Sequence, residues 1–589
     1  MKTVRHLSFV LLILLLVSCG PAFSPFAMPV IESRSPAATI EPDPRFAGGD
    51  GLGDPYFPIM GNSGYDVQHY TLDMAISLET NNIFSTVTID AVAEQKLSQF
   101  NLELKGFEIG QVSVDGIDAA FQRVGTEFTV IPASPIDEGQ AFSTVITYSG
   151  RPNADLTSSS FSYTDGWNYY NSGIMVAGEP SGSSTYYPVN EHPLDKATYT
   201  FIITVKRPLV VAANGLLIDT KRRGDYITYT WESKDPIASY LVTLAVGDFD
   251  LEEEKGPGGL PIRNYFASGI SKDIRKSFDR QGDMIEYFSE VFGPYPFEAY
   301  GVVVHDLPIR FALETQTLSV FGRSFTLEYV VSHELSHSWF GDSVSLTRWQ
   351  DIWLNEGFAT YASVLWTEHA YGYGAARGQM AEYYETIAPH YRYEEMTRYQ
   401  LAQKINSLLP KEDGTILTSS QVGEALKAIY SDQEKIDQVV SDLPAGGIPR
   451  NEFTDVFGEF QTMLMVSNTQ VNQVLAAIGI TEGFFETYTY PIPGQPPGDS
   501  LFNRSVYFRG ALALHALREK VGDDAFFTIL KTYASTYQYK NATIEDFITL
   551  SEEISGMELD QLFNSWLYDE YIPDLPELEL YREDFIPQN

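Results

Sequence analysis

The chain has 589 residues, 44% of them hydrophobic and 20% charged, which is typical of a folded protein of two or more domains and excludes a largely disordered one. Its formal net charge of -39 argues against nucleic acid or anionic lipid as a partner, because their phosphates would be repelled. The single cysteine, Cys19, excludes a disulfide within the chain.

Residues 1–18 have the pattern of a bacterial export signal. Lys2 and Arg5 precede an apolar run over residues 7–17, which is too short to span a membrane comfortably. The tetrapeptide Leu16-Val17-Ser18-Cys19 then resembles a lipobox, whose cysteine is acylated and becomes the first residue of a lipoprotein. We therefore expect Cys19 to carry a lipid that anchors the protein to a membrane on its extracytoplasmic side.

Two stretches of different character follow the export signal. Residues 19–64 are rich in Pro, Gly and Ala without sustained periodicity, which predicts a tether that forms no part of a core. Residues 65–255 contain alternating apolar and polar runs, such as 70–76 and 198–205, separated by turn residues. This patterning predicts an all-β sandwich domain.

Residues 256–589 are predicted to form a mainly helical domain. Two strands interrupt the helices, an apolar strand at 300–304 and an edge strand at 313–320. A helical and Gly/Pro-rich insertion is expected at about 390–500, and the sequence leaves open whether it is an active-site lid or peripheral decoration.

The motif His333-Glu334-Leu335-Ser336-His337 indicates a metal site. Residues four apart share one face of a helix, so both imidazoles can reach one ion, and Glu356 follows His337 after eighteen residues in a second helical run. Two imidazoles and a carboxylate suit Zn²⁺ with an open fourth position for water, and Glu334 is placed to act as general base. The class that takes a third histidine from H-E-x-x-H-x-x-G-x-x-H is excluded, because Phe340 and Ser343 occupy those later positions.

Two segments around this motif, SHELSHSWFGD at 332–342 and WLNEGFATY at 353–361, resemble the zinc aminopeptidase N and leukotriene hydrolase family of gluzincin metallopeptidases. The resemblance implies an N-terminal saddle-like β domain followed by a thermolysin-like, mainly α-helical catalytic domain. It also implies that His333, His337 and Glu356 hold one zinc ion while Glu334 activates water.

The segment FALETQT at 311–317 is similar to the family's Gly-Ala-Met-Glu-Asn exopeptidase motif. The resemblance implies that Ala312 lines the substrate and that Glu314 binds its free α-ammonium, which would start hydrolysis at the first residue. A fainter similarity around Gly178-Glu179-Pro180 implies that Glu179 assists with the amine. The alternative for Glu179 is a solvated loop glutamate.

The segment SVYFRGA at 505–511 is similar to the family's Val-Tyr-x-Lys-Gly-Ala segment, which implies that the Tyr507 hydroxyl stabilises the oxyanion. The alternative is an ordinary packing tyrosine. One departure concerns the metal: Ser363 stands where the family usually has an acidic partner for a zinc histidine, so zinc is held more loosely or another residue substitutes.

Together these residues predict a zinc-dependent metallo-aminopeptidase acting on peptides with a free N-terminus, with no required protein partner. Two alternatives stay open. One is a binding lipoprotein that retains the scaffold without catalysis. The other is an endopeptidase or epoxide hydrolase using the same zinc, although an internal peptide has no ammonium to neutralise Glu314.

Overall fold

The computed structural model describes residues 41–152, 166–170, 173–307, 311–388 and 490–585, with short stretches at 390–391, 416–427, 437, 440–441, 448–449 and 487–488. The chain divides into two compact units, Met1–Trp349 with Leu530–Thr543, and Gln350–Ile529 with Ile544–Asn589. Residues 1–40, which include Cys19 and the predicted export signal, lie outside the described part. Among the described residues, no helix combines the length and the apolar character needed to cross a bilayer.

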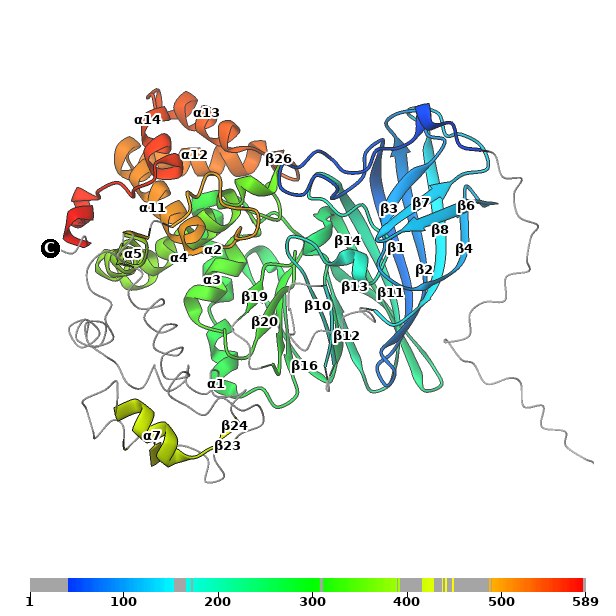
Figure 1. Cartoon of the computed structure of the whole chain (residues 1–589), viewed down its shortest axis with the longest axis horizontal. Coiled ribbons are helices and arrows are strands. Elements are labelled where there is room, and N and C mark those ends of the chain that lie inside the picture. The colour runs from blue at the N-terminus through cyan, green and yellow to red at the C-terminus, as the bar shows by residue number, and fades with distance from the viewer. Residues whose placement is uncertain are drawn as a thin grey trace, which may run out of the picture. The chain divides into compact units, whose positions relative to one another are not determined.

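The largest sheet of the first unit has eight strands in the order β13-β14-β11-β1-β2-β8-β4-β5 (Figure 1). Its strands are β1 (Tyr65–Ser77), β2 (Asn82–Ala93), β4 (Glu108–Val114), β5 (Ile117–Asp118), β8 (Ala141–Gly150), β11 (Lys196–Lys206), β13 (Leu216–Arg223) and β14 (Tyr226–Ala238). Alternate residues of β11, from Ala197 to Val205, are buried, as period-two patterning requires. The central strand β1 runs parallel to β11 and antiparallel to β2.

Two smaller sheets complete the β part, in the orders β3-β7-β6 and β12-β15-β10-β9. Their strands are β3 (Phe100–Glu103), β6 (Ala120–Val124), β7 (Glu127–Ile131), β9 (Gly166–Tyr170), β10 (Gly173–Ala177), β12 (Val210–Ala213) and β15 (Leu244–Gly247). The prediction of an all-β N-terminal part is therefore confirmed.

A five-stranded sheet, ordered β16-β17-β18-β20-β19, follows in the same unit. Its strands are β16 (Phe249–Lys255), β17 (Pro261–Ala267), β18 (Tyr300–His305), β19 (Ala312–Leu313) and β20 (Ser319–Gly322). The middle strands β17, β18 and β20 are parallel, and β18 is buried along its whole length, as its apolar run predicts. Residues 249–255, which the sequence assigned to the β domain, pair with β17 instead.

The expected edge strand at 313–320 is wrong in detail, because the structure has two short antiparallel strands, β19 and β20, joined by a turn. Thr317 in that turn has a left-handed backbone with φ of 65°. The Thr315 hydroxyl donates to the Leu318 carbonyl at 2.5 Å. Glu314 lies between β19 and this turn.

Among its described residues, the first unit also contains three α-helices and a two-stranded pairing. They are α1 (Lys272–Arg275), α2 (Gln281–Phe292), α3 (Glu328–Ser336), and β21 (Ser345–Leu346) paired with β26 (Asn541–Ala542).

Residues 41–64 are not the tether that the sequence predicts. The Asp54 side chain is buried and accepts hydrogen bonds from the backbone N–H groups of Tyr56, Phe57 and Trp349 at 2.7, 2.9 and 2.8 Å. The His192 Nε2 lies 3.5 Å from the Asp54 carboxylate, and neither side chain is exposed. This segment is therefore part of the folded unit.

The second unit is helical, and its central helix is α4 (Trp353–Tyr371). Every residue of α4 from Trp353 to Trp366 is buried, so this helix has no polar face and lies inside the unit. The other elements are α5 (Tyr373–Ile387), α7 (Ser419–Lys427), α11 (Arg504–Val521), α12 (Asp523–Thr536), whose last residues belong to the first unit, α13 (Ile544–Ser555), α14 (Asp560–Phe563), and the π-helix η8 (Asn564–Tyr568).

The insertion expected at about 390–500 falls mostly outside the described residues. The described pieces are α7 and the short pairings of β22 (His390–Tyr391) with β25 (Thr487–Tyr488) and of β23 (Ile416–Leu417) with β24 (Ile448–Pro449). Whether it is a lid or peripheral stays open.

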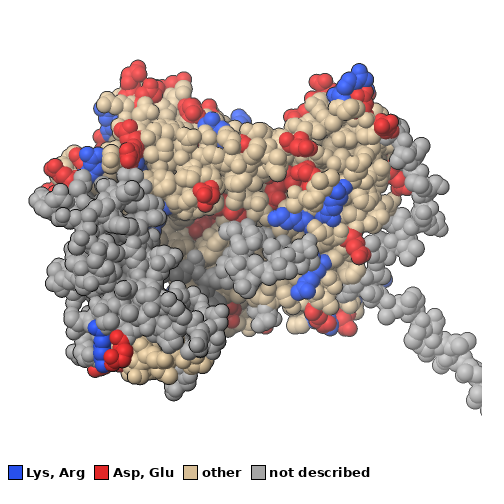
Figure 2. All heavy atoms as spheres, viewed as in Figure 1, with Lys and Arg blue, Asp and Glu red and all other residues tan. Residues whose placement is uncertain are grey.

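Charged side chains are dispersed on the face of the molecule shown in Figure 2. Asp and Glu form small groups across it, and Lys and Arg form a few others. On the described part of this face, neither sign is concentrated in one large patch.

Candidate active site

Helix α3 carries the paired histidines. The helix begins at Glu328, and His337 follows its last residue with a still helical backbone, φ -57° and ψ -23°. The His337 N–H therefore bonds to the His333 carbonyl at 3.3 Å, and the two rings meet edge to face with their centroids 4.8 Å apart. Their Nε2 atoms are 3.1 Å apart.

The two imidazoles fit a metal ion. The His337 Nδ1 lies 2.9 Å from the Phe340 carbonyl, which can only accept, so Nδ1 carries the proton and Nε2 presents its lone pair. Burial lowers the pKa of His333 to about 4, which keeps that ring neutral as well. Two ligand nitrogens on a tetrahedral zinc are separated by about 3.3 Å, close to the distance seen. A cation between them satisfies both lone pairs.

Two carboxylates meet the same histidine. Ligand atoms of Glu314, Glu334 and His337 all lie within 4.8 Å of one another, and the three residues are 2%, 6% and 1% exposed. Glu314 directly follows strand β19, whereas Glu334 lies on α3 and His337 directly follows that helix. The strand and the helix are in contact. Ala312, on the same short strand, is half-buried.

The turn after Glu314 is held by the β part of the same unit. The Thr317 hydroxyl accepts from the Gly215 N–H at 2.8 Å, and the Thr317 carbonyl accepts from Arg263 Nη2 at 3.1 Å. The Gln316 carbonyl accepts from Asn214 Nδ2 at 2.7 Å. These bonds fix the backbone that carries Glu314. Thr315, which stands where the family has Asn, uses its hydroxyl inside the turn.

Lys196 holds the loop that follows the histidines. From β11, its Nζ donates to the carbonyls of Asp342 and Ser343 at 3.0 and 3.1 Å and approaches that of Lys540 at 3.5 Å. Burial lowers the pKa of Lys196 to about 7, opposed by the nearby Asp342. Burial also raises the pKa of the Asp342 carboxyl well above its usual value, and Glu314 adds to that rise.

The sequence gives Lys196 no role, because a single lysine in an alternating strand resembles a surface residue. The loop fixed by Lys196 contains the Phe340 carbonyl that orients His337. Lys196 therefore contacts the predicted metal ligand His337 only indirectly, through this loop.

Glu356 and Tyr507 lie in the second unit. Glu356 is in the first turn of α4 and is 3% exposed, while Tyr507, near the start of α11, is half-buried. The two helices pack closely, because a Cβ built on Gly510 would lie 3.0 Å from the Gly357 Cα. The structure thus places both residues on a tightly packed helix pair.

Ser363 is buried within the second unit. Its hydroxyl donates to the Thr360 carbonyl at 2.7 Å and accepts from Gln379 Nε2 at 3.4 Å. The expectation that this serine loosens zinc stays a prediction. His337 has a partner in the Phe340 carbonyl instead.

Glu179 follows β10 and is only 7% exposed. The alternative of a solvated loop glutamate is therefore wrong, and its part in holding the amine stays a prediction. The roles of Glu356 and Tyr507 also stay predictions, and Cys19 lies outside the described residues.

Family models match most of the folded chain. The peptidase M1 N-terminal domain matches residues 66–241, and the peptidase family M1 domain matches residues 277–412 and 485–566. The second match omits residues 413–484, within the range of the expected insertion.

Known proteins similar to this chain include aminopeptidases and solved metallopeptidases. The leucyl aminopeptidase of Saccharolobus solfataricus is 30% identical over 34% of this chain and 27% of its own length. A probable aminopeptidase 2 of Sulfurisphaera tokodaii is 23% identical over 66% of this chain and 40% of its own. The structure of an M1 zinc metallopeptidase of Deinococcus radiodurans is 27% identical to this chain, with a TM-score of 0.65. The match covers 89% of this chain and 98% of that chain.

The chain spans less than half the length of the curated relatives that it matches. The Deinococcus structure, in contrast, is covered almost completely. The predicted family, the two-part fold and a single zinc as cofactor are confirmed by these similarities.

Proposed function

We propose that this chain, which belongs to the peptidase M1 family, is a zinc-dependent aminopeptidase that removes N-terminal residues from peptides. The observation that carries the proposal is the cluster of Glu314, Glu334 and His337 within one compact unit. It combines a metal-binding helix with an extra buried carboxylate that hydrolysis of an internal peptide bond does not require.

Glu314 is the residue that selects a free N-terminus. A buried carboxylate is stabilised by a substrate α-ammonium through a charge-assisted hydrogen bond. An N-acetylated or internal peptide offers only a neutral amide and leaves that charge uncompensated. Glu179 is expected to assist from the turn after β10, and Ala312 to lie along the substrate backbone.

Glu334 moves the proton. It takes a proton from the attacking water and passes it to the departing amine, which requires a carboxylate within hydrogen-bond reach of both. When bound, zinc supplies the acidity that makes water reactive near neutral pH and polarises the scissile carbonyl. His333 and His337 hold the ion, and the Phe340 carbonyl keeps His337 in the tautomer that can do so.

Glu356 and Tyr507 have the two remaining roles in the proposed mechanism. Glu356 supplies the third ligand, and the Tyr507 hydroxyl donates a hydrogen bond to the carbonyl oxygen as negative charge develops on it. Their position on packed helices supports a shared role, since one rigid pair would present both groups together. A variant of the Deinococcus enzyme was solved with a Tyr-Ser-Ala substrate, which supports a peptide as the ligand class.

The test compares Ala-, Leu- and Arg-p-nitroanilides with their N-acetylated forms, in buffer, with chelator and with zinc restored. Cleavage confined to free amines, lost with chelator and regained with zinc, is expected. Equal cleavage of the acetylated series would favour an endopeptidase. No cleavage of either series by protein that binds zinc would favour a non-catalytic scaffold or an epoxide hydrolase.

We also propose that the mature protein is a lipoprotein anchored through Cys19 to the extracytoplasmic side of a bacterial membrane. The support is the export signal closed by Leu16-Val17-Ser18-Cys19. Expression with labelled palmitate tests it. Label and membrane association in the natural chain, both lost in Cys19→Ser, are expected, and an unlabelled natural chain would refute the anchor.

A further inference from the structure

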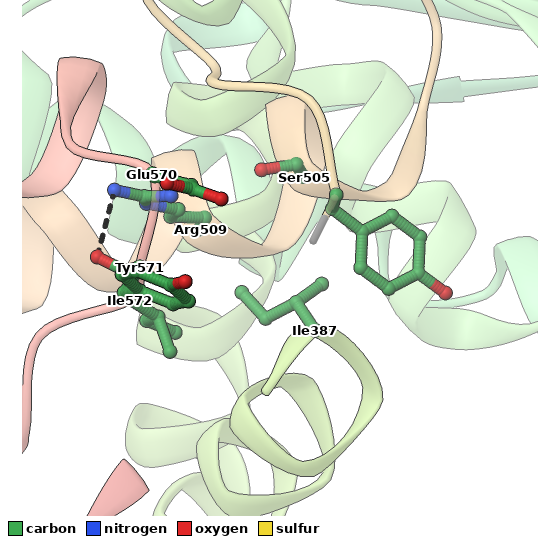
Figure 3. Close-up of a pocket in the computed structure, with 7 residues that line it drawn as sticks. Ile387, Ser505, Arg509, Glu570, Tyr571 and Ile572 are labelled. Carbon is green, nitrogen blue, oxygen red and sulfur yellow. Dashed lines mark hydrogen bonds between the residues drawn. The ribbon is translucent and has the colours of Figure 1, made fainter. Parts of the chain in front are cut away.

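Arg509 lies on α11 two residues after Tyr507. Successive residues of a helix are about 100° apart, so the Arg509 side chain leaves α11 about 200° around from that of Tyr507. It therefore lies on nearly the opposite face of the helix from the candidate catalytic tyrosine. Arg509 is 3% exposed, and Figure 3 shows its guanidinium against the chain at Glu570 to Ile572.

The guanidinium binds backbone carbonyls of the C-terminal segment. Its Nη2 donates to the carbonyls of Ser565, Asp569 and Tyr571 at 2.9, 2.6 and 3.3 Å. Ser565 belongs to the π-helix η8, and the other two follow its end. Carbonyls at the end of a helix carry partial negative charge, so a permanent cation is favoured there. Burial lowers the pKa of Arg509 to about 10, which leaves it charged at neutral pH.

A second contact holds another face of α11, about 100° around the helix from Arg509. Gly510 lies three residues after Tyr507, about 60° around the helix from it, and it approaches Gly357 of α4 with almost no space for a Cβ. Gly357 is the neighbour of Glu356. The helix that carries Tyr507 is therefore held on two faces, by α4 at Gly510 and by the carbonyls that Arg509 binds.

A pocket adjoins the guanidinium in Figure 3, lined among others by Ser505, Arg509 and Ile572. The Ser505 hydroxyl and the Arg509 Nε are buried and lack a hydrogen-bond partner among the described residues. Within the described part of the chain, the only hydrogen bonds of this guanidinium are therefore those of its Nη2.

We propose that Arg509 is a positioning residue for Tyr507, because its bonds to the carbonyls of Ser565, Asp569 and Tyr571 set the place of α11 against α4. The inference rests on the proposed role of Tyr507 as oxyanion donor. It predicts a loss in turnover without a loss in metal binding.

The experiment uses the full chain with Arg509→Met, Arg509→Lys and the matched control Ser505→Ala, which changes the same helix face and pocket but no bond to the C-terminal segment. For Arg509→Met we expect kcat to fall about 10- to 100-fold, with KM and zinc content unchanged, because misplacement of a catalytic group by about 1 Å has effects of that size. Arg509→Lys should recover part of the loss, and Ser505→Ala should behave as wild type.

The decisive measurement repeats the changes in a Tyr507→Phe background. If Arg509 acts through Tyr507, Arg509→Met should lower kcat no further there. An equal fractional loss in both backgrounds would overturn the inference. Wild-type turnover by Tyr507→Phe alone would instead refute the role of Tyr507. If Arg509→Met does not fold, Arg509→Lys carries the same comparison, and a Lys variant indistinguishable from wild type in kcat would overturn the inference.

Discussion

The candidate site residues fall into two sets, a first half on and around α3 and a second half on α4 and α11, and each set is held within its own unit by different means. Helix α3, with the histidines, is nine residues long, and its surroundings are fixed by hydrogen bonds from the side chains of Lys196, Asn214 and Arg263 to backbone carbonyls. Helix α4, with Glu356, is nineteen residues long, buried over most of its length and pressed against α11 at two glycines. Substitutions that remove a polar side chain should therefore disturb the first half. Substitutions that add side-chain volume should disturb the second.

The largest expected effect concerns the chemistry of the first half. Glu334→Gln removes the general base while preserving shape, so kcat should fall about 100- to 10,000-fold with zinc content unchanged. Steady-state kinetics and metal analysis measure both. The control is Glu328→Gln in the first turn of α3, where the carboxylate pairs with Arg280 at 2.9 Å and should be dispensable for turnover. A Glu334→Gln enzyme that retains its rate would remove Glu334 from the mechanism.

The next prediction tests whether hydrogen bonds from a side chain to the neighbouring backbone affect zinc affinity in this half. Lys196→Met frees the carbonyls of Asp342 and Ser343, and the loop that orients His337 should relax. Since outer partners of metal ligands tune affinity by about 10- to 100-fold, zinc should be lost to a chelator at correspondingly lower concentrations.

The control is Lys206→Met at the other end of β11, where the lysine is exposed and pairs with exposed Glu79. Equal zinc affinity in Lys196→Met and Lys206→Met would show that Lys196 stabilises the fold without affecting zinc binding.

The second half should respond to volume. Gly357→Val places a branched side chain where a Cβ already lies 3.1 Å from the Gly510 backbone. Overpacking of this kind typically lowers the free energy of unfolding by about 1 to 3 kcal/mol. Gly378→Val, in α5 with nothing within 4 Å of its Cβ position, is the control and should be nearly neutral. Thermal unfolding compares the two, and equal melting temperatures would argue against close packing of α4 and α11.

The smallest effect is a pH dependence in the second half. Burial lowers the pKa of His515 in α11 to about 4, and its Nδ1 lies 3.2 Å from the Tyr361 hydroxyl. Because the folded pKa lies below the unfolded value, His515 contributes stability above pH 6.5 and loses it as the pH falls towards 4.

At pH 5 that loss is about 2 kcal/mol at most. His515→Gln should therefore gain melting temperature relative to wild type as the pH is lowered from 7 to 5. A difference between the two proteins that does not change with pH would contradict a neutral, buried His515.

Local patterns made the metal-binding half predictable. Both histidines lie within one turn of helix, so spacing alone placed them on one face, and the buried run of α4 is visible in its composition. The class of fold followed from period-two strands and the helical residues beyond them.

Contacts between distant residues could not be predicted. Asp54 accepts from the Trp349 backbone 295 residues away, so composition alone misassigned residues 41–64 as a tether. The turn after Glu314 depends on Gly215 and Arg263, which explains why one continuous edge strand was expected. The roles of Lys196 and Arg509 arise from bonds to backbone carbonyls, which leave no mark in a sequence pattern.

The most direct test of the central claim measures zinc affinity by chelator competition in wild type, His337→Ala and Glu356→Gln, because it asks whether each of these predicted ligands holds the ion. One tightly held zinc in wild type is predicted. Each single change should weaken binding by more than the roughly 100-fold that an outer partner contributes. Wild-type affinity in Glu356→Gln would contradict Glu356 as a zinc ligand, and wild-type affinity in His337→Ala would contradict the metal-binding helix itself.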